Sequence, residues 1–343
     1  MNHARRQTNP SPPIMPAPTF CCLAGTPRGV FRISDQGDVT PLGPPDALVS
    51  SLALSAKGEV VVGTSAGQIL RHSMRNGRWE QAVVPEGLGG ISSLARLPGS
   101  SSSLLAGTET GQLLRSNDDG DTFGAFGELP PGAAPPGVQI SVLPDQPRQV
   151  AVLSSRGAEI VHLEDQAIEL VPGSGGIRHL AIHPRDHELW FALTADSILR
   201  SIDRGSHWTV ASKLQSSPRS IFIERWSPYR ILILSRDSDD APAHVKESSL
   251  STYDDHERSL RPLPSSVVDR PCDPTGEITC AAFVPAPQDS SFVYATDRGE
   301  VVQVFLSELR AELIASGLPP IHRLLCAPAD LLDPSRSGIY LLP

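Results

Sequence analysis

Residues 199–208 read LRSIDRGSHW and residues 114–123 read LRSNDDGDTF, so both stretches fit the pattern Ser-x-Asp-x-Gly-x-x-aromatic. In a tight turn of this composition, the carboxylate accepts backbone N–H bonds and the glycine supplies a positive φ angle. The aromatic residue at the end of the pattern is suited to packing between neighbouring elements. The two stretches therefore predict two equivalent hairpin turns in a repeated structure.

A longer repeat surrounds these turns. Residues 60–71 (VVVGTSAGQILR) match residues 104–115 (LLAGTETGQLLR) almost position for position, and looser copies occupy residues 23–32, 191–200 and 293–302. Each copy reads as a short apolar strand, a turn and a second strand, which is the signature of a β-hairpin. A repeat of about 40 residues is the length of one four-stranded propeller blade.

A third apolar run precedes most of these hairpins, and we interpret it as the innermost strand of each blade. Seven such strands favour a propeller of seven blades, within the usual range of four to eight. The predicted inner strands are Val49–Leu54, Ile91–Pro98, Val138–Pro144, Ile177–Pro184, Ser220–Arg225, Ile278–Pro285 and Ile321–Pro328.

The sequence thus predicts an all-β fold, a single propeller of seven blades with four antiparallel strands each. It would occupy residues 19–343 and follow a flexible, Pro-rich tail at residues 1–18. Because the chain opens with outer-type strands (Phe20 to Leu42) and ends with an inner-type strand (His322 to Ala327), the terminal strands should pair and close the ring. Residues 339–342 compete with residues 21–24 for one slot in that blade. Residues 307–316 resemble a helical turn, but the repeat places an outer strand there.

The two turns resemble the Asp-box (BNR) hairpins of β-propellers such as sialidases, sortilin-type receptors, xyloglucanases and photosystem II assembly factors. This resemblance implies that the turns join the two outer strands of a blade and have a structural role. Weaker copies of the motif begin at Asp35 and Asn76. The residues to which the resemblance gives this role are Ser116, Asp118, Gly120, Phe123, Ser201, Asp203, Gly205 and Trp208.

Composition limits the classes of partner. The formal net charge is −9, and no stripe of Lys and Arg interleaved with aromatic residues appears, so nucleic-acid binding is not expected. The sequence has no apolar run of transmembrane length, and residues 1–18 lack the apolar centre of a signal peptide. We therefore expect a cytoplasmic protein with no membrane association. Five cysteines without a C-x-x-C spacing predict no metal site, although Cys21, Cys22 and Cys326 would share the closing blade. No cofactor is predicted.

Aligning the inner strands places one residue of each blade near the mouth of the central channel. Two neighbouring blades then offer Arg178 and Arg219, and the closing blade offers His322 and Arg323. Guanidinium groups bind carboxylates and phosphates through paired hydrogen bonds. These four residues are the candidate ligand-binding residues. The alternative is that both arginines pair with loop carboxylates or lie in solvent.

Two further features have both a structural and a functional interpretation. The sixth blade has long loops at residues 236–246 and 265–277, which carry Asp237, Asp239, Asp240, Asp269 and Asp273. They are either solvated or able to hold a cation, but their spacing does not match a calcium loop. His179, His183 and His187 resemble a metal cluster, yet they fall on an ordinary strand-to-turn segment.

We expect a non-catalytic binding or assembly propeller that recognises a protein segment or a small anionic ligand on its top face. The alternative is an enzyme, either carbohydrate-active and sialidase-like or biosynthetic, with its site at the channel mouth. Phe31-Arg32 resembles the Arg motif of sialidases, but the repeat explains it, because Leu70-Arg71 and Leu114-Arg115 are local copies. Tyr253 and Glu257 lie close in sequence, without a convincing arrangement for catalysis.

Overall fold

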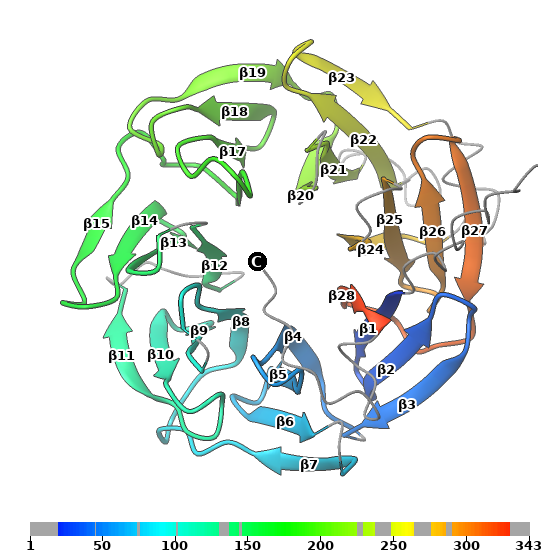
Figure 1. The fold of residues 1–343 in the computed structure, drawn as a ribbon. Coiled ribbons are helices and arrows are strands. Elements are labelled where there is room, and N and C mark those ends of the chain that lie inside the picture. The colour runs from blue at the N-terminus through cyan, green and yellow to red at the C-terminus, as the bar shows by residue number, and fades with distance from the viewer. Residues whose placement is uncertain are drawn as a thin grey trace, which may run out of the picture.

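The computed structural model contains seven four-stranded antiparallel sheets arranged around a central channel (Figure 1). It describes residues 20–44, 46–73, 76–100, 102–129, 137–143, 146–224, 229–236, 248–263, 276–285 and 290–329. The seven-bladed all-β propeller predicted from the repeat is therefore confirmed. Among the described residues, no helix has the length and apolar character that a membrane span requires.

The blades share one plan, in which the first strand lies next to the channel and the fourth lies at the rim (Figure 1). The first strands are β4 (Val49–Leu54), β8 (Ile91–Arg96), β12 (Gln139–Val142), β16 (His179–Ile182), β20 (Ser217–Ile223), β24 (Ile278–Phe283) and β28 (Arg323–Pro328). The second strands are β5 (Val60–Thr64), β9 (Leu104–Thr108), β13 (Gln149–Ser154), β17 (Trp190–Leu193), β21 (Ile231–Arg236), β25 (Ser291–Thr296) and β1 (Phe20–Thr26).

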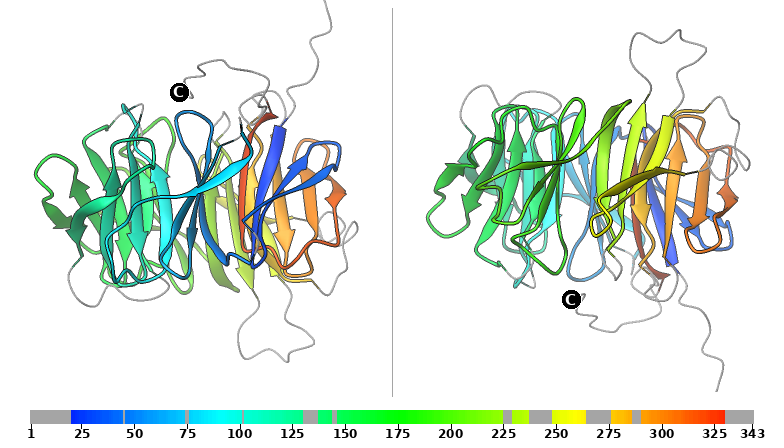
Figure 2. Two further views of the ribbon diagram at one scale, coloured as in Figure 1. Left: turned by 90° about the horizontal axis from the view of Figure 1, so that it is seen from below. Right: turned by 90° about the horizontal axis from the view of Figure 1, so that it is seen from above.

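The two outer strands of each blade follow in the same order. The third strands are β6 (Ile69–Ser73), β10 (Gln112–Ser116), β14 (Gly157–His162), β18 (Ser197–Ser201), β22 (Ser248–Asp254), β26 (Val301–Phe305) and β2 (Gly29–Ser34). The fourth strands are β7 (Arg78–Gln81), β11 (Gly124–Glu128), β15 (Ile168–Leu170), β19 (Thr209–Lys213), β23 (Ser259–Pro262), β27 (Arg310–Ala315) and β3 (Val39–Gly43). Edge-on views show a flat ring with loops on two faces (Figure 2).

The first and last described strands close the ring. β28 pairs antiparallel with β1, and Cys22 lies directly opposite Cys326. This pairing confirms the predicted closure, and β1 fills the slot for which residues 339–342, which lie outside the described residues, were the competitor. Residues 310–315 form a rim strand, as the repeat predicts.

Of the inner strands, β4 has its predicted bounds, and five others lie within the predicted ranges but are two to four residues shorter. β20 begins at Ser217, before the predicted start at Ser220. The missing N–H of Pro218 is a strand-breaking signal in the sequence. A register shift between Pro218 and Ser220 leaves Arg219 as the extra residue of a β-bulge, so that pairing continues past the proline.

The core is divided among the interfaces between blades. Buried apolar residues of the described chain form seven clusters, and each cluster draws its members from two neighbouring blades. Trp190, for example, packs with Ala151 of the preceding blade, and Phe191 on the other face packs with Ile233 of the following blade. Successive residues of a strand thus serve opposite faces of the sheet, as the period of two requires.

Three first strands carry a hydroxyl residue at a bulge, and this hydroxyl links one blade to the next. The Ser92 Oγ lies 3.1 Å from Gly107 O in its own blade and 2.9 Å from Val138 O of the next blade, and its one proton is shared between these two acceptors. Ser50 and Thr279 make the equivalent pairs of contacts, to Ile91 O and Ile321 O of their neighbours. We call the three contacts from Ser50, Ser92 and Thr279 to the following blade the hydroxyl latches.

The close contact between neighbouring blades also explains why Gly-Thr recurs at the end of second strands, at residues 63–64 and 107–108. A Cβ atom at Gly63 would come within 2.4 Å of the Ile91 side chain, and one at Gly107 within 2.7 Å of Val138. Such distances are too short for carbon atoms in van der Waals contact. The glycine therefore makes room for the apolar residue at the start of the next blade's first strand.

The repeated Leu-Arg pair forms a second connection between blades, on the opposite face. Arg71 forms an ion pair with Asp121 of the next blade, and the Arg115 Nη1 donates to Leu163 O at 2.9 Å. Arg200 binds Asp255 with an Nε–Oδ1 distance of 2.7 Å. In each case the arginine on a third strand reaches the turn between the outer strands of the following blade, and its repetition thus has a structural reason.

The hydroxyl latches predict a measurable cost. The substitution Ser92→Ala leaves two carbonyl groups without this donor and should lower the free energy of unfolding by about 1–2 kcal/mol. Urea unfolding followed by tryptophan fluorescence measures the change. Ser212→Ala is the matched control, because the Ser212 hydroxyl contacts only the carbonyl of the adjacent Lys213. Equal stability of Ser92→Ala and the control would show that the latches contribute nothing.

Candidate functional site

The turns at residues 116–123 and 201–208 join the third and fourth strands of their blades, β10 to β11 and β18 to β19. In the first, the Ser116 Oγ donates to the Asp118 Oδ1 at 2.8 Å and accepts from the Gly120 N–H at 2.9 Å. In the second turn, the Ser201 Oγ donates to the Asp203 Oδ1 at 2.8 Å, and the Gly205 N–H donates to the Ser201 Oγ at 2.8 Å. The two turns thus repeat one hydrogen-bond pattern.

Each carboxylate also accepts hydrogen bonds from the residue four positions later in the chain. Asp118 accepts from the N–H and the hydroxyl of Thr122, and Asp203 accepts from the N–H of His207 and contacts its Nδ1 at 2.6 Å. Burial raises the pKa of Asp118, but the bonds from Thr122 and Ser116 outweigh it, so the net pKa is below its usual value. The bonds from the His207 side chain and backbone lower the pKa of Asp203 to about 2.

Each turn ends on its aromatic residue. Phe123 is 3% exposed and packs in the cluster between its blade and the preceding one. Trp208 is partly buried, and its ring centroid lies 6.4 Å from that of Trp190. Both glycines have positive φ angles, +97° at Gly120 and +83° at Gly205. These hydrogen bonds and packing contacts tie each turn to its own blade and to the preceding one.

The predicted ligand residues lie at the other end of the first strands. We call this end the channel mouth, and the face that carries it the top face. Arg219 is the bulge residue of β20, at the position that Ser50, Ser92 and Thr279 occupy in other blades. Its side chain is exposed, and it forms no hydrogen bond or ion pair with another described residue. The arginine thus replaces a latch residue and leaves a charged group at the mouth.

Arg178 belongs to the neighbouring blade and directly precedes β16. Its backbone N–H donates to Leu193 O at 2.7 Å, which fixes the main chain. Its side chain is exposed and has no hydrogen bond or ion pair within the described part of the chain. The fold therefore places two arginines at equivalent ends of adjacent first strands, with both guanidinium groups available to an external ligand.

His322 and Arg323 occupy the closing blade and are more constrained. The His322 N–H donates to Gly25 O at 2.9 Å, the same backbone contact that Arg178 makes in its blade. The Arg323 Nε donates to Ser50 O at 2.7 Å and its Nη1 to His322 O at 2.9 Å. Arg323 thus connects the closing blade to the next one, although its side chain is exposed and keeps its positive charge at the mouth.

The histidines at the mouth are neutral near pH 7, so the positive charge there comes from arginine. Burial, together with the positive charge of the adjacent Arg178, lowers the pKa of His179 to about 4. Burial and Arg323 also lower the pKa of His322 below its usual value. None of the seven first strands contains an Asp or Glu residue. The mouth is therefore basic in a protein whose formal net charge is −9.

The carboxylates of the neighbouring hairpins are engaged elsewhere. Asp196 binds Lys213 with an oxygen–nitrogen distance of 2.7 Å, and Asp297 accepts from the Glu277 N–H at 2.8 Å. Glu277 itself pairs with Arg236. Among the described residues, neither Arg178 nor Arg219 forms an ion pair with a carboxylate.

The other sequence candidates do not come together. The His183 ring lies against that of Tyr229 at a tilt of 57°, with centroids 4.4 Å apart, and the carbonyl of His187 accepts from the Trp190 indole. Tyr253 is 1% exposed. Over the described residues, no group of three or more His, Cys, Asp and Glu side chains is placed to hold a metal ion. The five aspartates named in the long loops lie outside the described residues.

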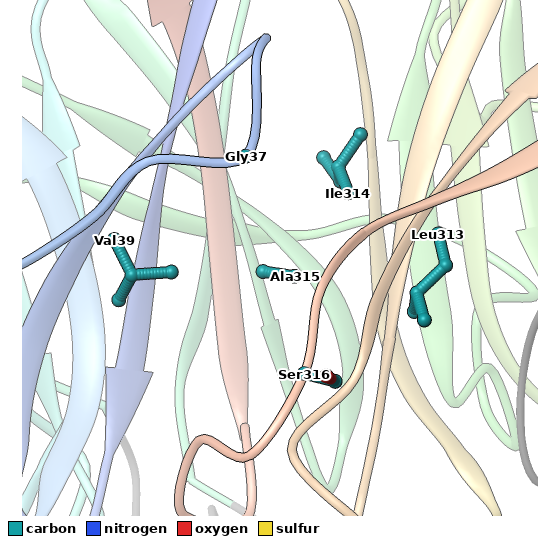
Figure 3. A pocket seen from close by; sticks show the side chains of 6 residues that line it. All are labelled: Gly37, Val39, Leu313, Ile314, Ala315 and Ser316. Atoms are coloured by element: carbon teal, nitrogen blue, oxygen red, sulfur yellow. The ribbon is translucent and has the colours of Figure 1, made fainter.

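A shallow, open depression of about 320 Å³ lies at the rim, away from the channel mouth (Figure 3). It is formed where β3 and β27 of neighbouring blades approach each other. Gly37 lies against the carbonyl of Ile314 there, and a Cβ atom would come within 2.5 Å of that oxygen. Its lining offers mainly backbone and small apolar groups, namely Gly37, Val39, Leu313, Ile314, Ala315 and Ser316.

Comparison with known proteins identifies the fold and no family. No protein-family model matches the sequence, and no curated protein matches it. A periplasmic gluconolactonase of Pseudomonas aeruginosa has a TM-score of 0.63 at 14% identity, over 90% of this chain and 99% of that one. A chain of a mitotic checkpoint complex has a TM-score of 0.58 at 14% identity, over 86% and 95%.

An ancestral GH74 enzyme has a TM-score of 0.59 at 7% identity, and the match covers 81% of this chain but only 38% of that one. At these identities the likeness shows a shared propeller fold and nothing of the activity. The neighbours include enzymes and a component of an assembly, so function has to be argued from the channel mouth.

The pKa of Asp203 makes a prediction for acid stability. Its pKa in the folded protein, about 2, lies below the ordinary value of 3.8, so its contribution to stability is present above pH 4 and is lost as the pH falls toward 2. Asp203→Asn should therefore unfold at a lower temperature than wild type at pH 5, and the difference should shrink at pH 2.5. Melting curves across this range, with exposed Glu86→Gln as the control, measure it. A difference that does not change with pH would contradict the account.

His179 predicts a second loss of stability on acidification, in a higher pH range than that of Asp203. Because its folded pKa of about 4 lies below the ordinary value of 6.5, the histidine is protonated at a higher pH in the unfolded chain, and stability falls as the pH drops from 6.5 to 4. This histidine accounts for up to about 3 kcal/mol of that loss. His179→Gln should flatten the decline in denaturant unfolding measured at pH 7, 5.5 and 4.5. A decline as steep as that of wild type would show that His179 is not the group responsible.

Proposed function

We propose that this protein is a non-catalytic binding propeller that recognises a small anion, or the anionic part of a protein segment, at the channel mouth. The observation that carries the proposal is the pair Arg178 and Arg219. Both side chains are exposed, and neither has a partner within the described residues. They belong to adjacent blades, so one ligand could reach both.

The chemistry of the pair favours carboxylate or phosphate groups. A guanidinium group offers several N–H donors in one plane, which matches the two oxygens of a carboxylate or phosphate. The first strands supply no competing carboxylate, and Arg323 adds a third positive charge held in place by backbone carbonyls. An anion at the mouth would therefore meet fixed positive groups without displacing an internal partner.

Binding is preferred to catalysis because of the residue types at the mouth. Glycoside hydrolysis ordinarily needs a pair of carboxylates at a defined separation, and the seven first strands provide none. Two of the structural neighbours are enzymes, but at 14% and 7% sequence identity they share only the fold with this chain. The proposal also keeps the cytoplasmic location expected from the sequence.

We further propose that the chain is an Asp-box propeller. Its support is the hydrogen-bond pattern that Ser116 and Asp118 share with Ser201 and Asp203, together with the position of both turns between the outer strands. The weaker copy at Asp35 keeps part of the pattern, because the Asp38 N–H donates to the Ser34 Oγ at 2.9 Å.

The binding proposal predicts stabilisation by anions. Inorganic phosphate, citrate or gluconate should raise the melting temperature of wild type, since an anion at 100 times its Kd adds about 2.7 kcal/mol to the folded state. The variant Arg178→Ala/Arg219→Ala should bind at least roughly 10-fold more weakly, because it loses two charge-assisted contacts. Calorimetric titration at constant ionic strength measures both affinities, so that simple screening does not contribute.

Arg185→Ala is the matched control, because Arg185 is an exposed arginine on the turn between β16 and β17, at the opposite end of the strands. It should bind as wild type does. An acidic peptide tested in parallel distinguishes a protein segment from a small molecule. Absence of binding by all probes, or equal binding by the double variant, would refute the proposal.

A further inference from the structure

The seam that closes the ring carries two cysteines in direct register. Cys22 of β1 lies opposite Cys326 of β28 in the antiparallel pair, and the two Sγ atoms are 2.8 Å apart. The residues are separated by 304 positions in the sequence, so only the closure of the ring brings them together.

The surrounding cysteines do not share this arrangement. Cys21 precedes Cys22 in the strand, so its side chain lies on the other face of the sheet and packs in the cluster with the following blade. Cys22 and Cys326 belong to the cluster with the preceding blade, together with Cys280. Cys280 makes its sulfur contact with Thr279, at 3.6 Å. Cys22 and Cys326 are thus the two cysteines that lie opposite each other in the strand pair and on the same face of the sheet.

Directly opposite residues of antiparallel strands have Cα atoms about 4.5–5.5 Å apart, which lies inside the range of about 4.4–6.8 Å found for disulfides. Because both side chains point to the same face, a bond can form without moving the backbone. We propose that Cys22 and Cys326 are a redox modification site, which forms a disulfide across the ring closure when the protein meets a small-molecule disulfide such as glutathione disulfide.

The two cysteines differ in exposure, and this difference sets the order in which they react with glutathione disulfide. Cys22 is 0% exposed, and burial raises the pKa of its thiol well above its usual value, whereas Cys326 is half-buried. The Cys326 thiolate attacks glutathione disulfide, forms a mixed disulfide and releases one glutathione thiolate. The Cys22 thiol then loses its proton and attacks the Cys326 sulfur, which releases the second glutathione. Two protein thiols are oxidised to one disulfide, and one glutathione disulfide is reduced to two glutathiones.

The bond would act on the whole ring. The pairing of β1 with β28 is the seam at which the two chain ends meet, and its opening exposes two strand edges. A covalent link across this seam prevents the terminal strands from separating. It also closes a loop of about 300 residues in the unfolded chain, which lowers the entropy of the unfolded state. Oxidation should therefore stabilise the closed propeller reversibly.

The test uses the full chain with Cys272→Ser, because Cys272 lies outside the described residues and could form a competing bond. The native protein is incubated with glutathione disulfide, quenched by acid and digested without reduction. We expect a cross-linked peptide that contains Cys22 and Cys326, a loss of two hydrogens from the intact mass, and faster migration on a non-reducing gel. The melting temperature should rise by roughly 5–10 °C and return on treatment with dithiothreitol.

Cys326→Ser should abolish all of these changes, whereas Cys21→Ser and Cys280→Ser should keep them. The peptide map of the wild-type pair is independent of the variants, so the proposal remains testable even if Cys22→Ser fails to fold. Either of two results would overturn it: glutathione attached to the protein without an internal bond, or an internal bond that survives Cys326→Ser.

Discussion

The antiparallel pairing of β1 with β28 is the contact on which the rest of the structure depends. Each of the seven apolar clusters is shared by two blades, so no blade buries its faces alone. The cluster around Phe20, Cys22 and Cys280 exists only when the ends of the chain meet. Without this pairing, one sheet would lack its first strand and two faces would be exposed, whereas closure removes both defects.

The residues at the entrance to the first strands connect the architecture to the proposed activity. Where the position holds Ser50, Ser92 or Thr279, the hydroxyl links two blades through backbone carbonyls. Where it holds Arg219, the latch is absent and a charge faces the solvent. Serine or threonine at this position connects two blades, whereas the blades that start at β16 and β20 place an exposed arginine there, on which the proposed recognition rests.

Much of the fold could be predicted from sequence because the repeat is strong. The Gly-Thr and Leu-Arg pairs recur, and each has a steric or ionic reason, at Gly63 and Arg71 for example. The start of β20 was misplaced because Pro218 signals a break and a bulge cannot be seen in one sequence. The partners of Arg323 were also out of reach, since its contact with Ser50 O joins residues from opposite ends of the chain. The register of Cys22 with Cys326 followed only from the three-dimensional pairing.

The claim that anions bind at the channel mouth is tested most directly by locating one. Crystals of the protein soaked in tungstate, a tetrahedral oxyanion with strong anomalous scattering, would show its position without assumptions about the natural ligand. The account predicts an anomalous peak within hydrogen-bonding distance of the Arg178 and Arg219 guanidinium groups, which disappears in Arg178→Ala/Arg219→Ala. A mouth without a peak, or peaks only at other surface arginines such as Arg185, would contradict it.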